Sequence, residues 1–533
     1  MRTRMRRRWL LVCLIPALAG ASPPPRLGVL LVFDQLSSPE LDELAPFFGA
    51  RGFGGLQGRG AARYDAVYGY CGTETAPGHA TLSTGTNPRS HGICANEWFE
   101  QGRRIYAVED PSAPVLGAAP GAMGLSARNL RAGTLGDAMK AQTHGRAKVV
   151  SISVKDRAAI LGGGSSADLA LWFEADQARF TSSKAFVDQL PAWAAELGRT
   201  LPTKSLASGR WSPLPVPAEL RALVGADVRP GEGAPAGFTT SFPHDLSQVE
   251  PRFRAQAYRS TPQAMDDSFA LALAAVDHEK LGTRGATDLL VLSISSTDYT
   301  GHTFGPASME KVDLLRRADV AVRRFLEALD ARLGSGGYAL VLSSDHGVSP
   351  LAEELQRIGL PAGRVQNDQV ESAAQGALEK GAFAAFEPPN VFFDEGTADP
   401  ATRNKRLERV ASAVRAVPGV RAVYRSDAGP PPRDPVAALL FESLCAGRGG
   451  PLLVQSEPYW VYSEKGSRVG THHATPYNYD RRVPLIVLGG GVKGGRYPES
   501  VDPRDAAPTL AFLLGVAPPA SAEGRVVPAV GAR

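Results

Sequence analysis

The chain has 533 residues, a length that suggests about three domains, and its sequence contains no internal repeat. Its formal net charge is +4, but five arginines lie within the first eight residues, and without them 53 basic residues balance 54 acidic ones. No basic stripe is present, which excludes nucleic acids and anionic membrane surfaces as partners. Any affinity for anions must therefore come from a local site.

The N-terminus has the pattern of a secretory signal peptide. The arginines precede an apolar run over residues 9–18, and small residues follow it, with cleavage expected after Ala19 or Ala21. This run is too short to cross a bilayer, and no later segment is long enough. We therefore expect residues 1–21 to be removed and the protein to be periplasmic or secreted, without stable membrane association. Cys13 does not follow a small residue, which argues against a lipid anchor, and both Sec and twin-arginine export remain open.

The first strand is expected over residues 26–34, a continuous apolar run that ends in Asp34. Continuous hydrophobicity is typical of a strand buried on both faces, as in the parallel sheet of an α/β fold. Ligands bind at the carboxyl ends of such strands. Asp34 is therefore a candidate site residue.

The segment from Tyr70 to Glu100 contains a candidate nucleophile, Thr75. The sequence Ala-Pro-Gly-His follows it, and small residues continue over 80–85, which predicts a tight turn that opens a helix. Backbone N–H groups and the helix dipole at such an N-terminus favour a phosphate-like adduct. The alternative is that Thr75 is an ordinary N-cap residue with proline in the first turn.

Three cysteines lie beyond the signal peptide: Cys71, Cys94 and Cys445. Because the compartment permits disulfides, Cys71 and Cys94, which flank the Thr75 segment, can form one. The alternative is three buried free thiols, and the odd number leaves one cysteine unpaired in either case.

A helix over residues 135–141 precedes a strand over 148–154 that delivers Lys155 and Arg157 at its end. In an extended chain, residues two apart point to the same side, so both side chains can reach one anion. Arginine supplies a planar fork for phosphate oxygens and lysine a point charge. A solvated charge cluster is the alternative.

Two further strands end in candidate metal ligands. The run over 287–294 leads to Asp298 and His302, which lie four residues apart, and the run over 338–344 leads to the pair Asp345 and His346. One helical turn brings two such residues to one metal. Helices are expected over 261–281 and 309–333, and a last strand and helix over 483–488 and 502–514.

Composition divides the chain into a core and two insertions. Prolines, tryptophans and weak periodicity mark residues 163–260 as an insertion or cap, and a Pro-rich joint marks a second insertion over 350–464. The catalytic core then consists of residues 22–162, 261–349 and 465–533.

Carboxylates and imidazoles thus gather at several strand ends. Mixed ligands of this kind without thiolate suit Zn²⁺ better than Mn²⁺ or Fe. The set is large enough for two ions, which would stabilise the attacking and leaving oxygens of a displacement at phosphorus. Its members are Asp34, Asp298, His302, Asp345, His346 and His473.

The chain resembles the alkaline phosphatase superfamily, in particular the type I phosphodiesterase/nucleotide pyrophosphatase-like branch with its single-chain, flavobacterial-type alkaline phosphatases. The motifs follow the family order over nearly the whole mature chain. They are Phe33-Asp34-Gln35, Thr75-Ala-Pro-Gly-His79, His91-Gly-Ile-Cys-Ala-Asn96, Lys155-Asp-Arg157, Asp298-Tyr-Thr-Gly-His302, Ser344-Asp-His-Gly347 and Gly470-Thr-His-His473.

This resemblance implies a three-layer α/β sandwich with a mostly parallel central sheet and inserted cap subdomains, holding two Zn²⁺ ions. One zinc would be bound by Asp298, His302 and His473, with His472 left open as the alternative to His473. The second zinc would be bound by Asp34, Asp345, His346 and the Thr75 oxygen. Asn96, Lys155 and Arg157 would hold the phosphoryl oxygens.

These parts predict that Thr75 attacks phosphorus and that water hydrolyses the phosphothreonine intermediate. We expect a monomeric alkaline phosphatase that acts on small phosphate monoesters, because Lys155 and Arg157 suit the more highly charged monoester. The alternatives are a phosphodiesterase/nucleotide pyrophosphatase and a metal-binding pseudoenzyme. A sulfatase is disfavoured because Cys71 does not begin a Cys-x-Pro-x-Arg pattern.

Overall fold

The computed structural model describes residues 24–531, apart from positions 236, 396–398 and 465. The predicted signal peptide, residues 1–21, lies outside the described residues. Within the described part, no helix is long and apolar enough to cross a membrane.

A nine-stranded sheet forms the centre of the molecule, in the order β19-β2-β18-β11-β1-β10-β5-β6-β7. The five central strands β11, β1, β10, β5 and β6 run parallel. Strand β18 runs antiparallel to both of its neighbours, β11 and β2, and β7 runs antiparallel to β6. This arrangement confirms the predicted α/β fold with a mostly parallel sheet. The strands are β1 (Leu27–Phe33), β2 (Ala62–Val67), β5 (Val149–Ser153), β6 (Leu169–Glu174), β7 (Arg179–Thr181), β10 (Asp288–Ile294), β11 (Tyr338–Ser343), β18 (Arg482–Leu488) and β19 (Gly495–Arg496).

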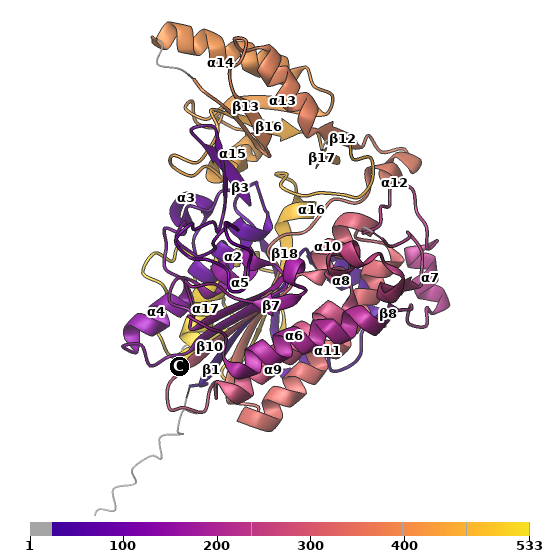
Figure 1. Ribbon diagram of the computed structural model, residues 1–533, viewed down its shortest axis with the longest axis vertical. Helices are drawn as coiled ribbons and strands as arrows, with labels where there is room; N and C mark the ends of the chain where they lie inside the picture. The colour runs from indigo at the N-terminus through magenta and orange to yellow at the C-terminus, as the bar shows by residue number, and fades with distance from the viewer. Residues whose placement is uncertain (1–23, 236, 396–398, 465, 532–533) are drawn as a thin grey trace, which may run out of the picture.

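Helices cover both faces of this sheet (Figure 1). Alternate residues of β1 belong to two different cores: Val29 and Leu31 pack with α9 and α11, whereas Leu30 and Val32 pack with α4 and α17. A strand that is buried on both faces is therefore the middle layer of three, as its continuous apolar run predicts. The covering helices are α2 (Thr75–Thr84), α4 (Leu135–Gln142), α5 (Asp156–Gly163), α6 (Ala192–Ser208), α9 (Pro262–His278), α11 (Met309–Leu333) and α17 (Ala506–Leu514).

Residues 163–260 contribute more to the sheet than an inserted cap would. Strand β6 pairs with β5, and β7 pairs with β6, so the central sheet continues to Thr181. The separate segment starts after β7 and packs on the side of α9 and α11 (Figure 1). Its elements besides α6 are β8 (Arg210–Trp211), α7 (Ala218–Val224), β9 (His244–Asp245) and α8 (Pro251–Tyr258).

Residues 350–464 form an upper lobe with its own four-stranded sheet, in the order β13-β14-β16-β15 (top of Figure 1). The helices α13 and α14 share a small hydrophobic core with this sheet. The lobe occupies the range predicted as a second insertion, and the domain boundaries themselves stay a prediction. Its elements are α12 (Ala352–Arg357), β12 (Gly363–Gln366), α13 (Asn367–Gly376), β13 (Ala384–Glu387), β14 (Asn390–Phe393), α14 (Pro400–Arg415), β15 (Val420–Arg425), α15 (Pro435–Glu442), β16 (Leu452–Ser456) and β17 (Trp460–Ser463).

The remaining elements lie around the carboxyl ends of the central strands. In the parallel ladder, Phe33 of β1 pairs with Ile294 of β10, and Val32 pairs with Ser343 of β11. The polar residues that follow these three strands therefore meet at one edge of the sheet. The remaining elements are α1 (Ser38–Leu44), α3 (Pro88–His91), β3 (Glu97–Glu100), β4 (Arg103–Tyr106), α10 (Ser296–Phe304) and α16 (Asn478–Arg481).

Candidate active site

Two groups of metal-ligating side chains meet at this edge. Their ligand atoms lie within 4.8 Å of one another in each group, and all six residues except the half-buried His302 are buried. Asp298 and His302 lie one turn apart on α10, as their spacing predicts. The first group consists of Asp298, His302 and His473, and the second of Asp34, Asp345 and His346.

The three histidines present their Nε2 atoms to the site. In His302, Nδ1 donates to the carbonyl of Thr471 at 2.7 Å, and in His473 it donates to the carbonyl of Thr73 at 2.7 Å. His346 Nδ1 likewise donates to the carbonyl of Gly347 at 2.9 Å. A histidine that donates from Nδ1 keeps its Nε2 lone pair free for a metal ion.

The charge and polarity of the groups also suit cations. The Nε2 atoms of His302 and His473 face each other at 3.2 Å, which places two lone pairs together. Burial, followed by the neighbouring carboxylates of Asp298 and Asp345, raises the pKa of Asp34 well above its ordinary value. A bound cation would relieve both repulsions, so the donor set fits metal ions with nitrogen and oxygen ligands.

His472 stands outside both groups. Its ring centroid lies 4.9 Å from that of His302, and it lines the adjoining cavity. Burial lowers the pKa of His472 to about 3. The geometry therefore brings His473, rather than His472, to the first group.

Thr75 is the first residue of α2, and Glu74 occupies the N-cap position before it. The alternative that Thr75 is an N-cap residue is therefore wrong. The Thr75 side chain is buried, and its hydroxyl lies 2.9 Å from Lys155 Nζ. A Cβ at Gly78 would lie 2.4 Å from the carbonyl oxygen of Asp345, so only glycine lets α2 approach the second metal-ligating group this closely.

Lys155 and Arg157 reach the site from the start of α5. Helix α5 begins at Asp156, so Lys155 is its N-cap and Arg157 lies in its first turn. The extended-chain reason for their convergence is therefore wrong, although both side chains approach the same site. Lys155 Nζ also lies 2.8 Å from Asp34 and 2.5 Å from Asp298. Because Lys155 is buried and Arg157 largely so, the alternative of a solvated charge cluster is wrong as well.

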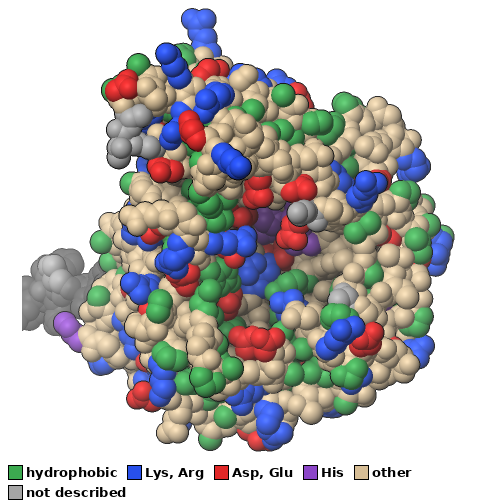
Figure 2. Space-filling model, turned by 45° about the horizontal axis from the view of Figure 1, so that its top comes forward, with side chains coloured by type: hydrophobic (Ala, Val, Ile, Leu, Met, Phe, Trp, Pro, Cys, Tyr) green, Lys and Arg blue, Asp and Glu red, His purple; other side chains and the backbone are tan. Residues whose placement is uncertain are grey.

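The site opens into a cavity of about 790 Å³ that Asn96, Arg157, His302 and His473 line from the catalytic core. Figure 2 shows this hollow, with histidines at its floor and acidic side chains at its mouth. Its opposite wall comes from the upper lobe, and none of the described residues of 163–260 lines the cavity. The lobe residues in the wall are Asn367, Asp368, Glu371, Phe386, Glu387, Pro388, Tyr462 and Glu464.

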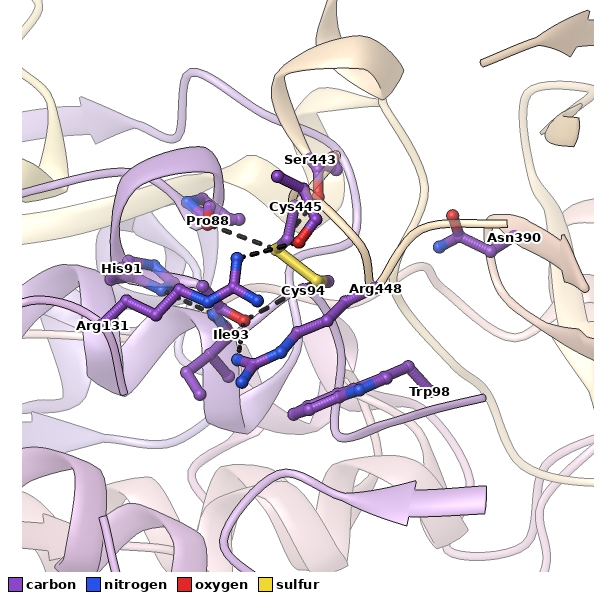
Figure 3. The surroundings of a disulfide bond; sticks show 12 residues. Pro88, His91, Ile93, Cys94, Trp98, Arg131, Asn390, Ser443, Cys445 and Arg448 are labelled. Carbon is purple, nitrogen blue, oxygen red and sulfur yellow. Dashed lines mark hydrogen bonds between the residues drawn. A yellow bond between two sulfur atoms is a disulfide. The ribbon is translucent and has the colours of Figure 1, made fainter. Parts of the chain in front are cut away.

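The disulfide joins Cys94 to Cys445 (Figure 3), and Cys71 is a buried free thiol. Both predicted alternatives, a bond between Cys71 and Cys94 and three free thiols, are therefore wrong. The partners lie 351 residues apart, so no spacing in the sequence indicates the pair. Cys71 instead donates from Sγ to the carbonyl of Ala474 at 3.3 Å.

Two residues with clear contacts at the site were not predicted as site residues. Gln35, which has a left-handed φ of 63°, donates from its backbone to Asp345 at 3.1 Å and from its side chain to Asp298 at 2.9 Å. Glu74 lines the cavity next to Thr75. Burial raises the pKa of Glu74 to about 7. The position of Gln35 directly after Asp34 was the available signal, whereas Glu74 gave none.

Comparisons with known proteins agree with this geometry. The type I phosphodiesterase/nucleotide pyrophosphatase family model matches residues 29–477. Alkaline phosphatase PhoV of Synechococcus elongatus is 32% identical, over 94% of this chain and 92% of the relative. Alkaline phosphatase PafA of Elizabethkingia meningoseptica is 30% identical, over 98% of both chains. The crystal structure of wild-type alkaline phosphatase PafA superposes with a TM-score of 0.86 at 28% identity, covering 96% of this chain and all of that one. The chain therefore belongs to the type I phosphodiesterase/nucleotide pyrophosphatase family.

Proposed function

We propose that the chain is a zinc-dependent alkaline phosphatase that hydrolyses small phosphate monoesters through a phosphothreonine intermediate on Thr75. The observation that carries this proposal is the meeting of two metal-ligating groups with a buried hydroxyl at the N-terminus of α2. The names of the relatives support the same activity.

Zinc fits the donor set because carboxylates and imidazoles surround both positions without a thiolate. Asp298, His302 and His473 would hold one ion. Asp34, Asp345 and His346 would hold the other, with Thr75 beside it. When bound, such ions act as Lewis acids on oxygen and lower the pKa of a hydroxyl group.

The reaction uses Thr75 as the nucleophile. Its oxygen forms a bond to phosphorus while the bond from phosphorus to the ester oxygen breaks, and the alcohol leaves. Water then attacks the phosphothreonine, which releases inorganic phosphate and restores the hydroxyl. The positive end of the α2 dipole stabilises the phosphoryl group during both steps.

Asn96, Lys155 and Arg157 supply the remaining contacts to the phosphoryl oxygens. A monoester dianion carries more charge on these oxygens than a diester does, so two cationic side chains favour the monoester. Diester hydrolysis is the alternative, because the family description includes phosphodiesterases. The presence of both ligand groups and Thr75 argues against a pseudoenzyme.

The protein would work as an exported monomer on small-molecule substrates. Its N-terminal pattern supports export, and a cavity of about 790 Å³ has room for a small ester.

The test is to measure kcat/KM for an aryl phosphate monoester and for its methyl diester, with zinc content determined on the same preparation. We expect two zinc ions per chain, a clear preference for the monoester, loss of activity with a chelator, and recovery with zinc. A preference for the diester would support the alternative. Full activity without any transition metal would contradict the mechanism, and a zinc-loaded protein without turnover would indicate a pseudoenzyme.

A further inference from the structure

Asn96 is held at three of its four polar groups. Its backbone N–H donates to Glu74 Oε2 at 2.6 Å, and its carbonyl accepts from the N–H of Ala107 at 2.9 Å. Its side-chain oxygen accepts from the N–H of Ala76 at 2.9 Å. Because a backbone N–H can only donate, this bond fixes which end of the amide is oxygen. The Asn96 NH₂ group is therefore the one polar group left to face the cavity.

Glu74 and Asn96 share the capping of α2 in an unusual way. Glu74 stands at the N-cap position, where shorter side chains such as Asp or Ser accept from the first helix amides, and it makes no such bond. Asn96 takes that role by accepting from Ala76, two residues after the cap. The carboxylate of Glu74 is thereby free to hold the Asn96 backbone. Asn96 therefore donates to Glu74 and accepts from Ala76. Thr75 lies between these two residues in the sequence.

We infer that Glu74 is a positioning residue for phosphoryl transfer, which acts by holding Asn96 in a fixed relation to Thr75. This inference rests on the proposed function, because it assigns the Asn96 amide to a phosphoryl oxygen. A carboxylate that lines a phosphate-binding cavity repels its substrate. The hydrogen bond from the Asn96 backbone N–H gives a reason for a carboxylate at this position.

Other contacts hold the flanks of the Asn96 segment without Glu74. The Cys94–Cys445 disulfide lies two residues before Asn96, and Arg448 donates to the carbonyl of Gly92 at 2.6 Å while its guanidinium lies 4.7 Å from the Trp98 ring centre (Figure 3). Replacing Glu74 therefore releases the Asn96 backbone N–H, and the segment itself stays attached.

The test is a double-mutant cycle on kcat/KM for an aryl phosphate monoester, with Glu74→Ala, Asn96→Ala and the double variant. A hydrogen bond to a charged group is worth about 1.5–3 kcal/mol, so Asn96→Ala should cost on the order of 10–10²-fold. Glu74→Ala should cost about 10-fold in the wild type and almost nothing in the Asn96→Ala background. Glu74→Gln should recover most of the loss, because its amide oxygen also accepts from the Asn96 N–H.

A binding measurement and a control variant separate an effect on Asn96 from a general loss of activity. Calorimetric affinity for inorganic phosphate should fall in Glu74→Ala and return in Glu74→Gln, with zinc content unchanged. The control Glu219→Gln, an exposed carboxylate of α7 that does not line the cavity, should leave both quantities near the wild-type values. Equal losses from Glu74→Ala with and without Asn96, or no loss at all, would overturn the inference. An inactive wild type would instead overturn the proposed function, and the phosphate affinities would still test the contact.

Discussion

At the scale of single residues, the position of Thr75 decides what its hydroxyl can do. Thr75 is the first residue of α2 and not its N-cap. Its hydroxyl oxygen is not needed as the acceptor for the Ala76 N–H, because Asn96 accepts from it instead. The hydroxyl lies beside Lys155 and the two metal-ligating groups. The first turn of α2 therefore holds the hydroxyl beside both groups.

We therefore predict that Thr75→Ala abolishes the covalent intermediate and lowers kcat by several orders of magnitude, because a positioned nucleophile is removed. Thr75→Ser keeps the hydroxyl and should stay active. Acid quenching during turnover, followed by mass spectrometry, should find a phosphate on residue 75 in the wild type and the serine variant. A fully active alanine variant would assign the reaction to another group.

The second prediction at this scale concerns Lys155 and Arg157. Their charges act in a largely buried site where Coulomb interactions are stronger than in bulk water. Each charge-assisted contact is worth about 1.5–3 kcal/mol, so replacing both with alanine should lower monoester hydrolysis on the order of 10²–10³-fold more than diester hydrolysis. The measurement is kcat/KM on both ester classes with zinc content determined, because Lys155 also contacts Asp34 and Asp298. Equal losses on both substrates would show a structural role.

Five of the six metal-ligating residues could be predicted from the sequence because they follow β1, β10 and β11, and parallel strands bring their ends together. The sixth, His473, lies in a loop and was selected by the resemblance. The roles of Glu74 and Cys445 could not be predicted. Glu74 depends on a hydrogen bond to Asn96, and Cys445 on a partner 351 residues away. Such contacts arise only when the segments are folded against each other, and no periodicity encodes them.

At the scale of elements, a buried pair joins the segment after β7 to α11. His244 Nε2 lies 3.0 Å from Glu310 Oε1, and both side chains are fully buried. Burial lowers the pKa of His244 to about 4, whereas burial, with Asp227 and Asp313 nearby, raises the pKa of Glu310 to about 8. The folded pair therefore holds one proton between these two values. Aromatic rings surround His244, namely those of Trp211, Phe238, Phe242 and Phe304.

This pair predicts a loss of stability at alkaline pH. Above the ordinary histidine pKa of 6.5, the unfolded pair has released both protons, while the folded pair keeps one until about pH 8. The folded state binds more protons in this window, so the free energy of unfolding falls as pH rises, by about 1.4 kcal/mol per unit. Glu310→Gln should remove this part of the slope, which amounts to about 2 kcal/mol between pH 6.5 and 8.

Urea unfolding of the wild type and Glu310→Gln at pH 6.5 and 8.5 measures the difference. The exposed Glu219→Gln in α7 is the matched control and should behave as the wild type. Identical pH slopes in wild type and Glu310→Gln would show that Glu310 is already ionised in the folded protein.

The element boundaries show why strand ends were easier to predict than insertions. Strands β1, β10 and β11 are continuous apolar runs and were placed within one or two residues. Strands β6 and β7 fell inside the predicted cap. Strand β6 is an apolar run that was not recognised as a strand, whereas β7 is only three residues long and has no such pattern. A short edge strand takes its conformation from the neighbour with which it pairs, and not from its own pattern.

At the scale of the whole molecule, residues around the central sheet and residues of the upper lobe line the cavity together. The central sheet supplies the metal-ligating groups, and the upper lobe supplies the opposite wall. Between them, Arg448 and Cys445 of the lobe contact the segment that ends in Asn96, and Ser443 donates to the carbonyl of Cys71 at 2.7 Å. The shape of the cavity therefore depends on how firmly the lobe is attached.

The last prediction concerns this attachment. A disulfide stabilises a fold by restricting the unfolded chain, typically by about 2–4 kcal/mol and more for longer loops, and Cys94–Cys445 closes a loop of 351 residues. Replacing both cysteines with serine, or reducing the wild type, should lower the urea midpoint of the lobe's unfolding and raise KM more than it lowers kcat, because the cavity wall loosens while Thr75 stays on α2. Cys71→Ser is the matched control. Its free thiol is buried, and this variant should keep the wild-type response to reductant. If the double variant unfolds at the wild-type midpoint with an unchanged KM, the hydrogen bonds of Arg448 and Ser443 are sufficient to hold the lobe.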